Sequence, residues 1–214
     1  MMRIALIHAL AHSVAPINDE FARAWPDAQR MNLLDDSLSA DLAQRGQGLD
    51  AAMHLRFEAL AAYAVGTGAQ AILFTCSAFG PCIEAVARRY ADIPVLKPNE
   101  AMVQEAAAHG GRVGLIASFT PTLTSMPAEF PAQVDLRSAL ADGAMEALNR
   151  GDLAMHDALV VAAARELAAA SCTVIALAQF SMARAAPAVR DALGLPVLTT
   201  PGSAVQALRQ RLAP

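Results

Sequence analysis

The sequence predicts an α/β fold built from two related halves, each a parallel sheet with helices on both of its faces. Short apolar runs alternate along the chain with stretches whose apolar residues recur at helical spacing. Apolar runs without alternation suit strands that are buried on both faces, as in parallel sheets. Several segments also recur about a hundred residues later. We therefore expect two halves related by a pseudo-twofold axis, with the active site between them.

The internal repeat rests on three pairs of segments whose order is the same in both halves. Their offsets are 109, 103 and 102 residues, and the pairs are Arg3–Ile7 with Arg112–Ile116, Ala71–Ser77 with Val174–Phe180, and Ile93–Leu96 with Leu195–Leu198. A nearly constant offset indicates a duplicated unit. Within the second pair Cys76 corresponds to Gln179. Two equivalent positions therefore carry a thiol and an amide.

The hydrophobic pattern gives an order of elements. We expect strands at 4–8, 30–34, 71–75, 94–96, 113–117, 174–177 and 197–199. We expect helices at 18–25, 48–65, 83–90, 100–109, within 139–148, and at 152–169, 183–193 and 203–212. A proline-bearing loop is expected at 119–131. No linker-like segment separates the halves, which we assign to residues 1–97 plus 200–214 and to residues 98–199.

Composition excludes several classes of function. The chain has 214 residues, a net charge of −4 and a single lysine, which argues against binding to nucleic acid. No apolar stretch reaches membrane-spanning length without a charge or proline, and the apolar N-terminus reads as a strand rather than a signal peptide. The three cysteines have no zinc spacing, and glycine-rich phosphate loops are absent. We expect a cytoplasmic protein without metal or nucleotide cofactor.

Cys76 is the candidate for chemistry. It lies where a predicted strand runs into a helix, and a thiol at a helix N-terminus has a lowered pKa because the free N–H groups favour the thiolate. A buried structural cysteine is the alternative reading. We expect Cys82 and Cys172 to be structural.

Hydroxyl groups are concentrated after the first strand of the second half. Five of them lie within residues 118–125, where they can hold a carboxylate or merely cap a solvated turn. The matching loop of the first half carries His12 and Ser13. His12 is a candidate hydrogen-bond partner for a substrate, whereas His8 at the strand end equally suits a satisfied core residue. The remaining histidines, His54, His109 and His156, are expected on the surface.

The whole chain resembles the aspartate/glutamate racemase superfamily, which includes hydantoin racemases, maleate isomerases and arylmalonate decarboxylases. The resemblance rests on the Phe74–Ser77 and Leu177–Ser181 corners and on Arg112–Ile116 before a threonine-rich loop. Further matching features are Gly143-Ala144, Gly151-Asp152 and Leu195–Leu198. The individual motifs are short, so the resemblance depends on their order and spacing.

The resemblance implies a cofactor-independent reaction on a small carboxylate. Racemases of the family carry a cysteine at both corners, one on each side of the substrate. Cys76 matches the first, whereas Gln179 replaces the second, and an amide neither gives up nor donates a proton usefully near neutral pH. The decarboxylases use one cysteine at the second corner, so this chain would be a mirror arrangement. The maleate isomerases use the first cysteine as nucleophile and the second as acid.

We therefore predict an isomerase, racemase-like or decarboxylase-like enzyme with a single active-site cysteine, acting as a homo-oligomer. Cys76 and Gln179 are the predicted catalytic pair. The predicted substrate-binding residues are His12, Ser13, Ser77, Thr120, Thr122, Phe180 and Ser181. Phe79, Phe119 and Phe180 suggest a partly apolar pocket, which argues against free aspartate as substrate. The alternative is a non-catalytic carboxylate-binding protein of the same fold.

Overall fold

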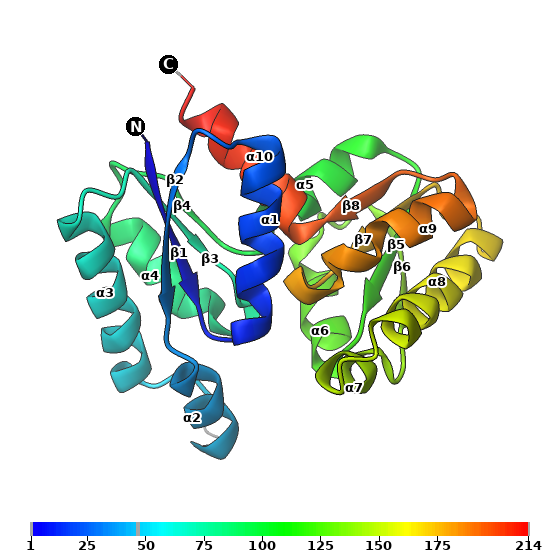
Figure 1. Cartoon of the computed structure of the whole chain (residues 1–214), viewed down its shortest axis with the longest axis horizontal. Coiled ribbons are helices and arrows are strands. Elements are labelled where there is room, and N and C mark those ends of the chain that lie inside the picture. Colours follow the sequence, from blue (N-terminus) through cyan, green and yellow to red (C-terminus); the bar gives the residue numbers. More distant parts are fainter. Residues whose placement is uncertain (1, 46–47, 214) are drawn as a thin grey trace. The chain divides into compact units, whose positions relative to one another are not determined.

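A computed structural model describes residues 2–45 and 48–213 of the chain (Figure 1). The chain divides into two compact units. The first comprises Met1–Asn99 together with Ala204–Pro214, and the second comprises Glu100–Ser203. The residue-level boundaries expected from the sequence, 1–97 with 200–214 and 98–199, remain a prediction.

The first unit is a four-stranded parallel sheet in the order β2-β1-β3-β4. Figure 1 shows α3 on one face of this sheet and α1 on the other. Its strands are β1 (Arg3–His8), β2 (Gln29–Leu34), β3 (Ala71–Phe74) and β4 (Val95–Leu96). Its helices are η1 (Ala11–Ser13), α1 (Val14–Ala24), α2 (Ser37–Arg45), α3 (Ala51–Gly66), η2 (Ser77–Phe79) and α4 (Gly80–Arg89), with most of α10 (Thr200–Arg211).

The core of the first unit explains its uninterrupted apolar strands. All four residues of β3 are buried, as are the last five of β1. On one face of the sheet, the Phe57 ring of α3 lies 5.3 Å from Phe74 and 4.9 Å from Phe79, centroid to centroid. Burial of large aromatic side chains in this way supplies much of the stabilisation of such a core. Phe79 is thus a fully buried core residue, and its proposed place in a substrate pocket stays a prediction.

The second unit repeats this architecture, with a parallel sheet in the order β6-β5-β7-β8. On one face α8 packs with α7 and α9, and on the other α5 and α6 pack against β5 and β7. Its strands are β5 (Arg112–Ala117), β6 (Asp135–Leu140), β7 (Val174–Leu177) and β8 (Val197–Thr199). Its helices are α5 (Glu100–His109), α6 (Thr120–Ser125), η3 (Met126–Glu129), α7 (Ala144–Asn149), α8 (Leu153–Ala169), η4 (Phe180–Ala185) and α9 (Ala186–Leu193).

The sequence repeat and the strand register agree. Ile4 pairs with Ala71 in the first sheet, and their counterparts Val113 and Val174 pair in the second. The same holds at the outer strand, where Ile72 pairs with Val95 and Ile175 pairs with Val197. The predicted α/β fold of two parallel-sheet halves is therefore confirmed.

One side-chain contact is repeated as well. The Arg3 guanidinium donates to the carbonyl of Thr67, the C-cap residue of α3, and the Arg112 guanidinium donates to the carbonyl of Ala170, the C-cap residue of α8. A cation at a helix C-terminus compensates carbonyls that have no partner within the helix. Each first strand is thus tied to the helix that precedes the neighbouring strand.

Several elements differ from the expectation. The segment predicted as a loop at 119–131 contains α6 and η3, each with a proline in its first turn, where the missing N–H costs nothing. Strand β6 was missed, whereas α7 (Ala144–Asn149) forms where a helix was expected within 139–148 and ends one residue later. The short polar helix α2 was also missed, and α1 begins at Val14. No described helix is long and apolar enough to span a membrane.

Candidate active site

Cys76 and Gln179 occupy the same place in their respective units. Each follows the inner strand next to β1 or β5 and caps a short 3-10 helix, η2 for Cys76 and η4 for Gln179. Their backbones are alike, with φ −130° and ψ 122° at Cys76 and φ −128° and ψ 145° at Gln179. In open parallel sheets ligands bind at this carboxyl end of the strands. The two positions singled out by the repeat are therefore structurally equivalent.

The Cys76 side chain is half-buried and lines a small pocket of the first unit with His8, Ala9 and Leu38. Burial raises the pKa of its thiol, although hydrogen bonds from the Ala78 backbone and from the Ser39 side chain act in the opposite direction. The lowered pKa expected from a helix N-terminus was therefore wrong. The reason is that η2 has only three residues, so its N–H groups do not outweigh the cost of burying a charge.

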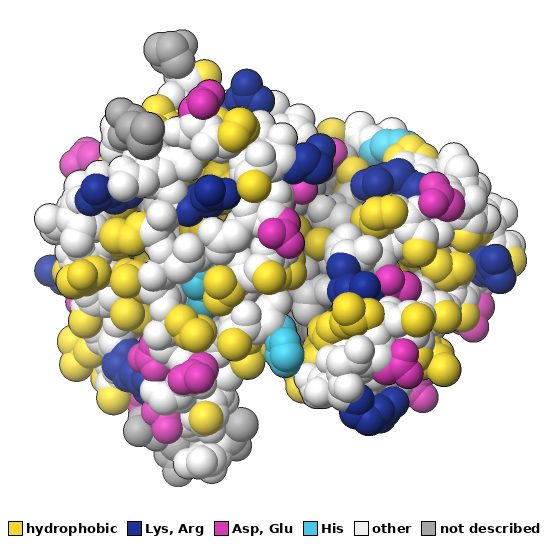
Figure 2. All heavy atoms as spheres, in the orientation of Figure 1, with side chains coloured by type: hydrophobic (Ala, Val, Ile, Leu, Met, Phe, Trp, Pro, Cys, Tyr) yellow, Lys and Arg dark blue, Asp and Glu magenta, His cyan; other side chains and the backbone are white. Residues whose placement is uncertain are grey.

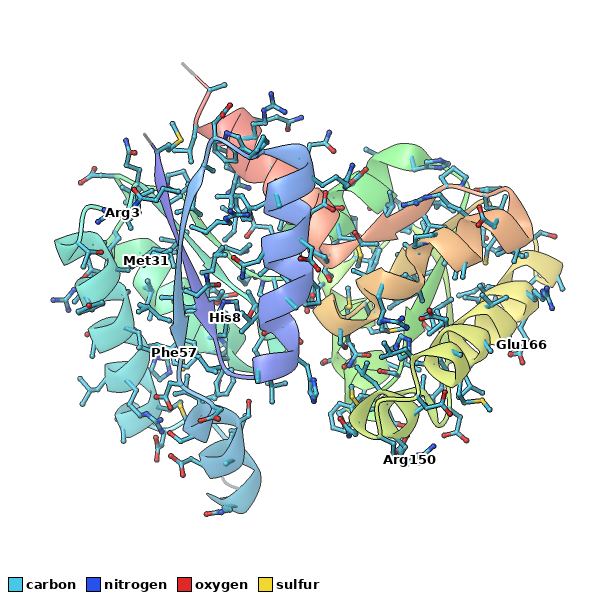
Figure 3. The ribbon with its side chains drawn as sticks, viewed as in Figure 1. Arg3, His8, Met31, Phe57, Arg150 and Glu166 are labelled. Carbon is cyan, nitrogen blue, oxygen red and sulfur yellow. The ribbon has the colours of Figure 1, made fainter. Side chains whose placement is uncertain are left out.

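A buried hydrogen-bond network lies beside Cys76. The fully buried His8 places Nδ1 2.9 Å from the Thr75 hydroxyl and Nε2 3.0 Å from Oδ1 of Asn32. Since Oδ1 of Asn32 also accepts from Asn18, the geometry assigns the proton to Nε2 and makes Nδ1 the acceptor for Thr75. Burial lowers the pKa of His8, opposed by the bond to Asn32, so a neutral ring fits this site. His8 lies in the interior of the first unit (Figure 3).

Some residues of the loop after β1 belong to this buried network, and others are exposed to solvent. His8 is the satisfied core histidine that the sequence offered as one reading. Ser13 is buried, and its hydroxyl donates to the Leu10 carbonyl while lying 2.9 Å from Thr75. His12, in contrast, is exposed, and so is Ser77 after β3. Of the predicted ligands in this unit, only His12 and Ser77 have solvent-exposed side chains.

Gln179 is held by a serine of its own unit. Its Oε1 accepts from the Ser118 backbone N–H at 2.7 Å and from the Ser118 hydroxyl at 2.9 Å. With the oxygen engaged twice, the carboxamide has a fixed orientation and its NH₂ is the group left to donate. Ser118 follows β5, and its counterpart after β1 is Ala9, so this contact is specific to the second unit.

The other predicted residues of the second unit have different exposures. Thr120 and Phe119 are exposed, and Ser181 is half-buried. Thr122 is buried at the position that matches Ser13. Phe180 is also buried, with only 4% of its surface exposed, so its side chain packs rather than lining an open surface.

Several remaining polar residues have structural explanations. Arg56 of α3 binds Asp35 and Asp41 at 2.6 Å each, so both carboxylates are paired with a cation. Among residues 2–45 and 48–213, no group of three His, Cys, Asp or Glu residues is placed to hold a metal ion. The expectation of a surface position was wrong for His156, which is fully buried on α8 beside Asp157. On the face drawn in Figure 2, basic side chains are interspersed with acidic and apolar ones.

Comparison with known proteins identifies the family. The sequence model of the Asp/Glu/hydantoin racemase family matches residues 12–208, which is nearly the whole chain. The chain belongs to the Asp/Glu/hydantoin racemase family. A search of curated proteins gave no match.

Solved structures of low sequence identity share the fold of this family member. An aspartate racemase homologue from Pyrococcus horikoshii OT3 has a TM-score of 0.74 at 14% identity, covering 99% of both chains. An allantoin racemase from Klebsiella pneumoniae has a TM-score of 0.71 at 19% identity, covering 100% of this chain and 88% of the other. A cysteine-substituted mutant of arylmalonate decarboxylase has a TM-score of 0.63 at 21% identity, covering 97% and 92%.

Sequence reasoning missed two residues of this site, Ser39 and Ser118. Ser39 lies on α2, a helix that the sequence pattern did not indicate; its hydroxyl donates to the Ala9 carbonyl and lies within hydrogen-bonding reach of the Cys76 thiol. Ser118 was noted only as one of five hydroxyls, and the repeat offset alone pairs it with Ala9 rather than with Gln179. Its contact with Gln179 arises because β5 and β7 are neighbours in the sheet, and this strand order cannot be read from the sequence.

Proposed function

We propose that this racemase-family protein is a cofactor-independent enzyme that delivers a proton to one face of a small carboxylate-stabilised carbanion. Cys76 is the proton donor, and Gln179 is a donor of hydrogen bonds to a carboxylate or enolate oxygen. The observation that carries the proposal is the equivalence of the two positions, one occupied by a thiol and the other by an amide whose oxygen is held by Ser118.

The protonation state of Cys76 favours an acid over a base. Burial raises the pKa of its thiol, so the thiol is the form present near neutral pH. A thiol transfers a proton to a carbanion directly, whereas abstraction of an α-proton first needs the thiolate. This supports a reaction in which the carbanion arises from the substrate by another bond cleavage, such as loss of CO₂.

The amide at Gln179 limits the stereochemistry. A two-base racemization needs a second group that exchanges a proton on the opposite face, and a carboxamide has no proton to exchange near pH 7. Its NH₂ can, however, stabilise negative charge that develops on a substrate oxygen. A substrate with a second carboxylate on the reacting carbon, a 2-substituted malonate, therefore suits the site better than an amino acid.

The test is turnover of a panel of 2-aryl and 2-alkyl malonates in D₂O, beside aspartate and glutamate. We expect release of CO₂, one deuterium at the α-carbon and a product of one configuration. Cys76→Ser should lower the rate by about 10²–10⁴-fold, since a positioned acid contributes that much. Cys172→Ser, at a buried cysteine of the second unit, is the matched control.

Two results would contradict the proposal. Rapid racemization of aspartate or glutamate by the unaltered protein would require a second proton-transfer group. Saturable binding of the malonates without turnover, unaffected by Cys76→Ser, would instead indicate a carboxylate-binding protein that has no catalytic step.

A further inference from the structure

Ser39 is held beside Cys76 by contacts on several sides. Its hydroxyl donates to the Ala9 carbonyl at 2.9 Å and is also within hydrogen-bonding reach of the Cys76 thiol. The preceding residue, Leu38, is fully buried in the core and lines the same small pocket as Ala9 and Cys76. The position of Ser39 is thus set by core packing rather than by an exposed loop.

The start of α2 is also clamped to α3. The Arg56 guanidinium binds Asp35 and Asp41, and it donates to the Ser37 hydroxyl at 2.6 Å. Asp35 precedes α2, whereas Ser37 and Asp41 lie on it, so these contacts bracket Ser39 on both sides. A side chain bracketed in this way loses less conformational freedom when it makes a further hydrogen bond.

The serine is present only in the unit that has the thiol. The registers of β1 with β2 and of β5 with β6 place Leu34 opposite His8 and Leu140 opposite Ala117. Counting on from these strands by the same offset, Leu38 matches the buried Ala144 and Ser39 matches Met145. The hydroxyl therefore accompanies Cys76, while the unit with Gln179 has a thioether at the matching position.

We propose that Ser39 is the positioning residue that stabilises the Cys76 thiolate, by turning its single hydroxyl proton from the Ala9 carbonyl to the Cys76 sulfur. In the thiol state the S–H group donates to Ser39 Oγ, and Ser39 donates to Ala9. When Cys76 gives up its proton, to a carbanion or to water, the Ser39 hydroxyl rotates, keeps its proton and donates a hydrogen bond to the sulfur, and the Ala9 carbonyl loses this donor. A hydroxyl has one proton, so the two contacts exclude each other.

Few other groups act on this thiol. Its protonation is governed by burial, by the Ala78 backbone N–H and by Ser39. The titratable residue that lines the same pocket from β1 is His8, which is neutral because burial lowers its pKa. Asp35 and Asp41 near Ser39 are neutralised by Arg56. Ser39 is therefore the side chain through which the stability of the thiolate is adjusted.

The inference rests on the proposed role of Cys76, but its test needs no substrate. Ser39→Val and Ser39→Thr have the same shape, and only the second retains the hydroxyl. Iodoacetamide alkylation of Cys76, followed by mass spectrometry from pH 6 to pH 11, reports the thiolate fraction. A hydrogen bond to a charged group is strong enough that its loss should slow alkylation at pH 8 by about tenfold in Ser39→Val relative to Ser39→Thr.

The shape of the pH profile distinguishes stabilisation of the Cys76 thiolate by Ser39 from a change in the access of iodoacetamide to the thiol. If Ser39 stabilises the thiolate, the Ser39→Val profile moves to higher pH and reaches the same plateau as Ser39→Thr. Coincident profiles of the two variants would overturn the inference, as would a lower plateau without a shift, which indicates a blocked thiol. If the malonate assay fails while the shift is found, the proposed reaction is wrong and the role of Ser39 stands.

Discussion

The Gln179 carboxamide oxygen accepts two hydrogen bonds from Ser118, one from its backbone N–H at 2.7 Å and one from its hydroxyl at 2.9 Å. An amide held in this way presents its NH₂ in one orientation, because exchanging O and N would set donor against donor. The second unit thus has a preorganised hydrogen-bond donor at the position where the first unit has a thiol. The difference between Cys76 and Gln179 is supported by a neighbouring residue and does not stand alone.

Replacing Gln179 by cysteine should introduce proton transfer on the second face. We expect Gln179→Cys to lose stereochemical purity, giving product of both configurations and slow exchange of the α-proton in D₂O. The reason is that a thiol exchanges protons and an amide does not. Chiral chromatography with mass spectrometry measures both effects. Gln179→Ser, which also removes the amide but adds no thiol, should slow the reaction and keep one configuration; mixed product from it would refute the assignment.

Thiol labelling should rank the three cysteines by exposure as well as by pKa. Cys76 is half-buried, whereas Cys82 and Cys172 are buried, and burial raises the pKa of Cys82 to about 11. We expect Cys76 to be alkylated first, with a rate that rises with pH because burial raises its pKa also. Labelling kinetics resolved by peptide mass spectrometry test this order. Equal rates at the three sites would remove Cys76 from its proposed role.

Ser171 should be strained by its backbone. It has φ 64°, and it occupies the turn after α8 that Gly68 makes after α3 with φ 85°. A left-handed conformation costs a non-glycine residue about 1–2 kcal/mol. Replacement by glycine removes this strain, but glycine loses more chain entropy on folding, which offsets part of the gain. Ser171→Gly should therefore stabilise the protein by about 0.5–1 kcal/mol in urea unfolding.

The counterpart substitution gives a matched control for this turn. A Cβ built at Gly68 meets nothing within 4 Å, so Gly68→Ser adds backbone strain without a steric clash. It should destabilise by about the amount that Ser171→Gly gains. A neutral result for both substitutions would mean that the left-handed turn is not strained in solution.

Most of the fold could be predicted from the sequence because buried parallel strands have an uninterrupted apolar pattern. β7 and α5 have the bounds that were predicted, and the repeat offsets reproduce the strand register. The edge strand β6 was missed because four of its six residues are exposed, with charges at Asp135 and Arg137, so it has no continuous apolar run. The threonine- and proline-rich α6 was read as a loop because propensity does not record the packing that stabilises a short helix.

The position of the candidate site could be predicted from the sequence, but the residues that contact Cys76 and Gln179 could not. The repeat identified Cys76 and Gln179, since equivalence of position is a property of the sequence itself. The partners Ser39 and Ser118 come from elements brought together only by folding, α2 against η2 and β5 against β7. The pKa of Cys76 was predicted in the wrong direction because burial, which the sequence does not show, outweighs the N–H groups of a three-residue helix.

The free energy of unfolding should depend on pH in part through the protonation of His8. Burial lowers the pKa of His8 in the folded state below its ordinary value of 6.5. The unfolded chain then binds a proton as the pH falls below 6.5, and the folded protein does not until its own lower pKa is reached. The stability conferred by the neutral ring is thus fully present above pH 6.5 and is lost as the pH falls through the folded pKa, at up to about 1.4 kcal/mol per pH unit.

Comparison with two variants isolates this contribution. Carboxylates also lose stability in acid, so the free energy of unfolding of His8→Gln is measured beside the unaltered protein from pH 4.5 to pH 8. His8→Gln should be less stable at pH 8, because the bonds to Thr75 and Asn32 are disturbed, and flatter below pH 6.5. His109→Gln, at an exposed histidine, should retain the slope of the unaltered protein. Parallel curves for His8→Gln and the unaltered protein would show that folding leaves the pKa of His8 unshifted, and the buried neutral network with Thr75 would then be wrong.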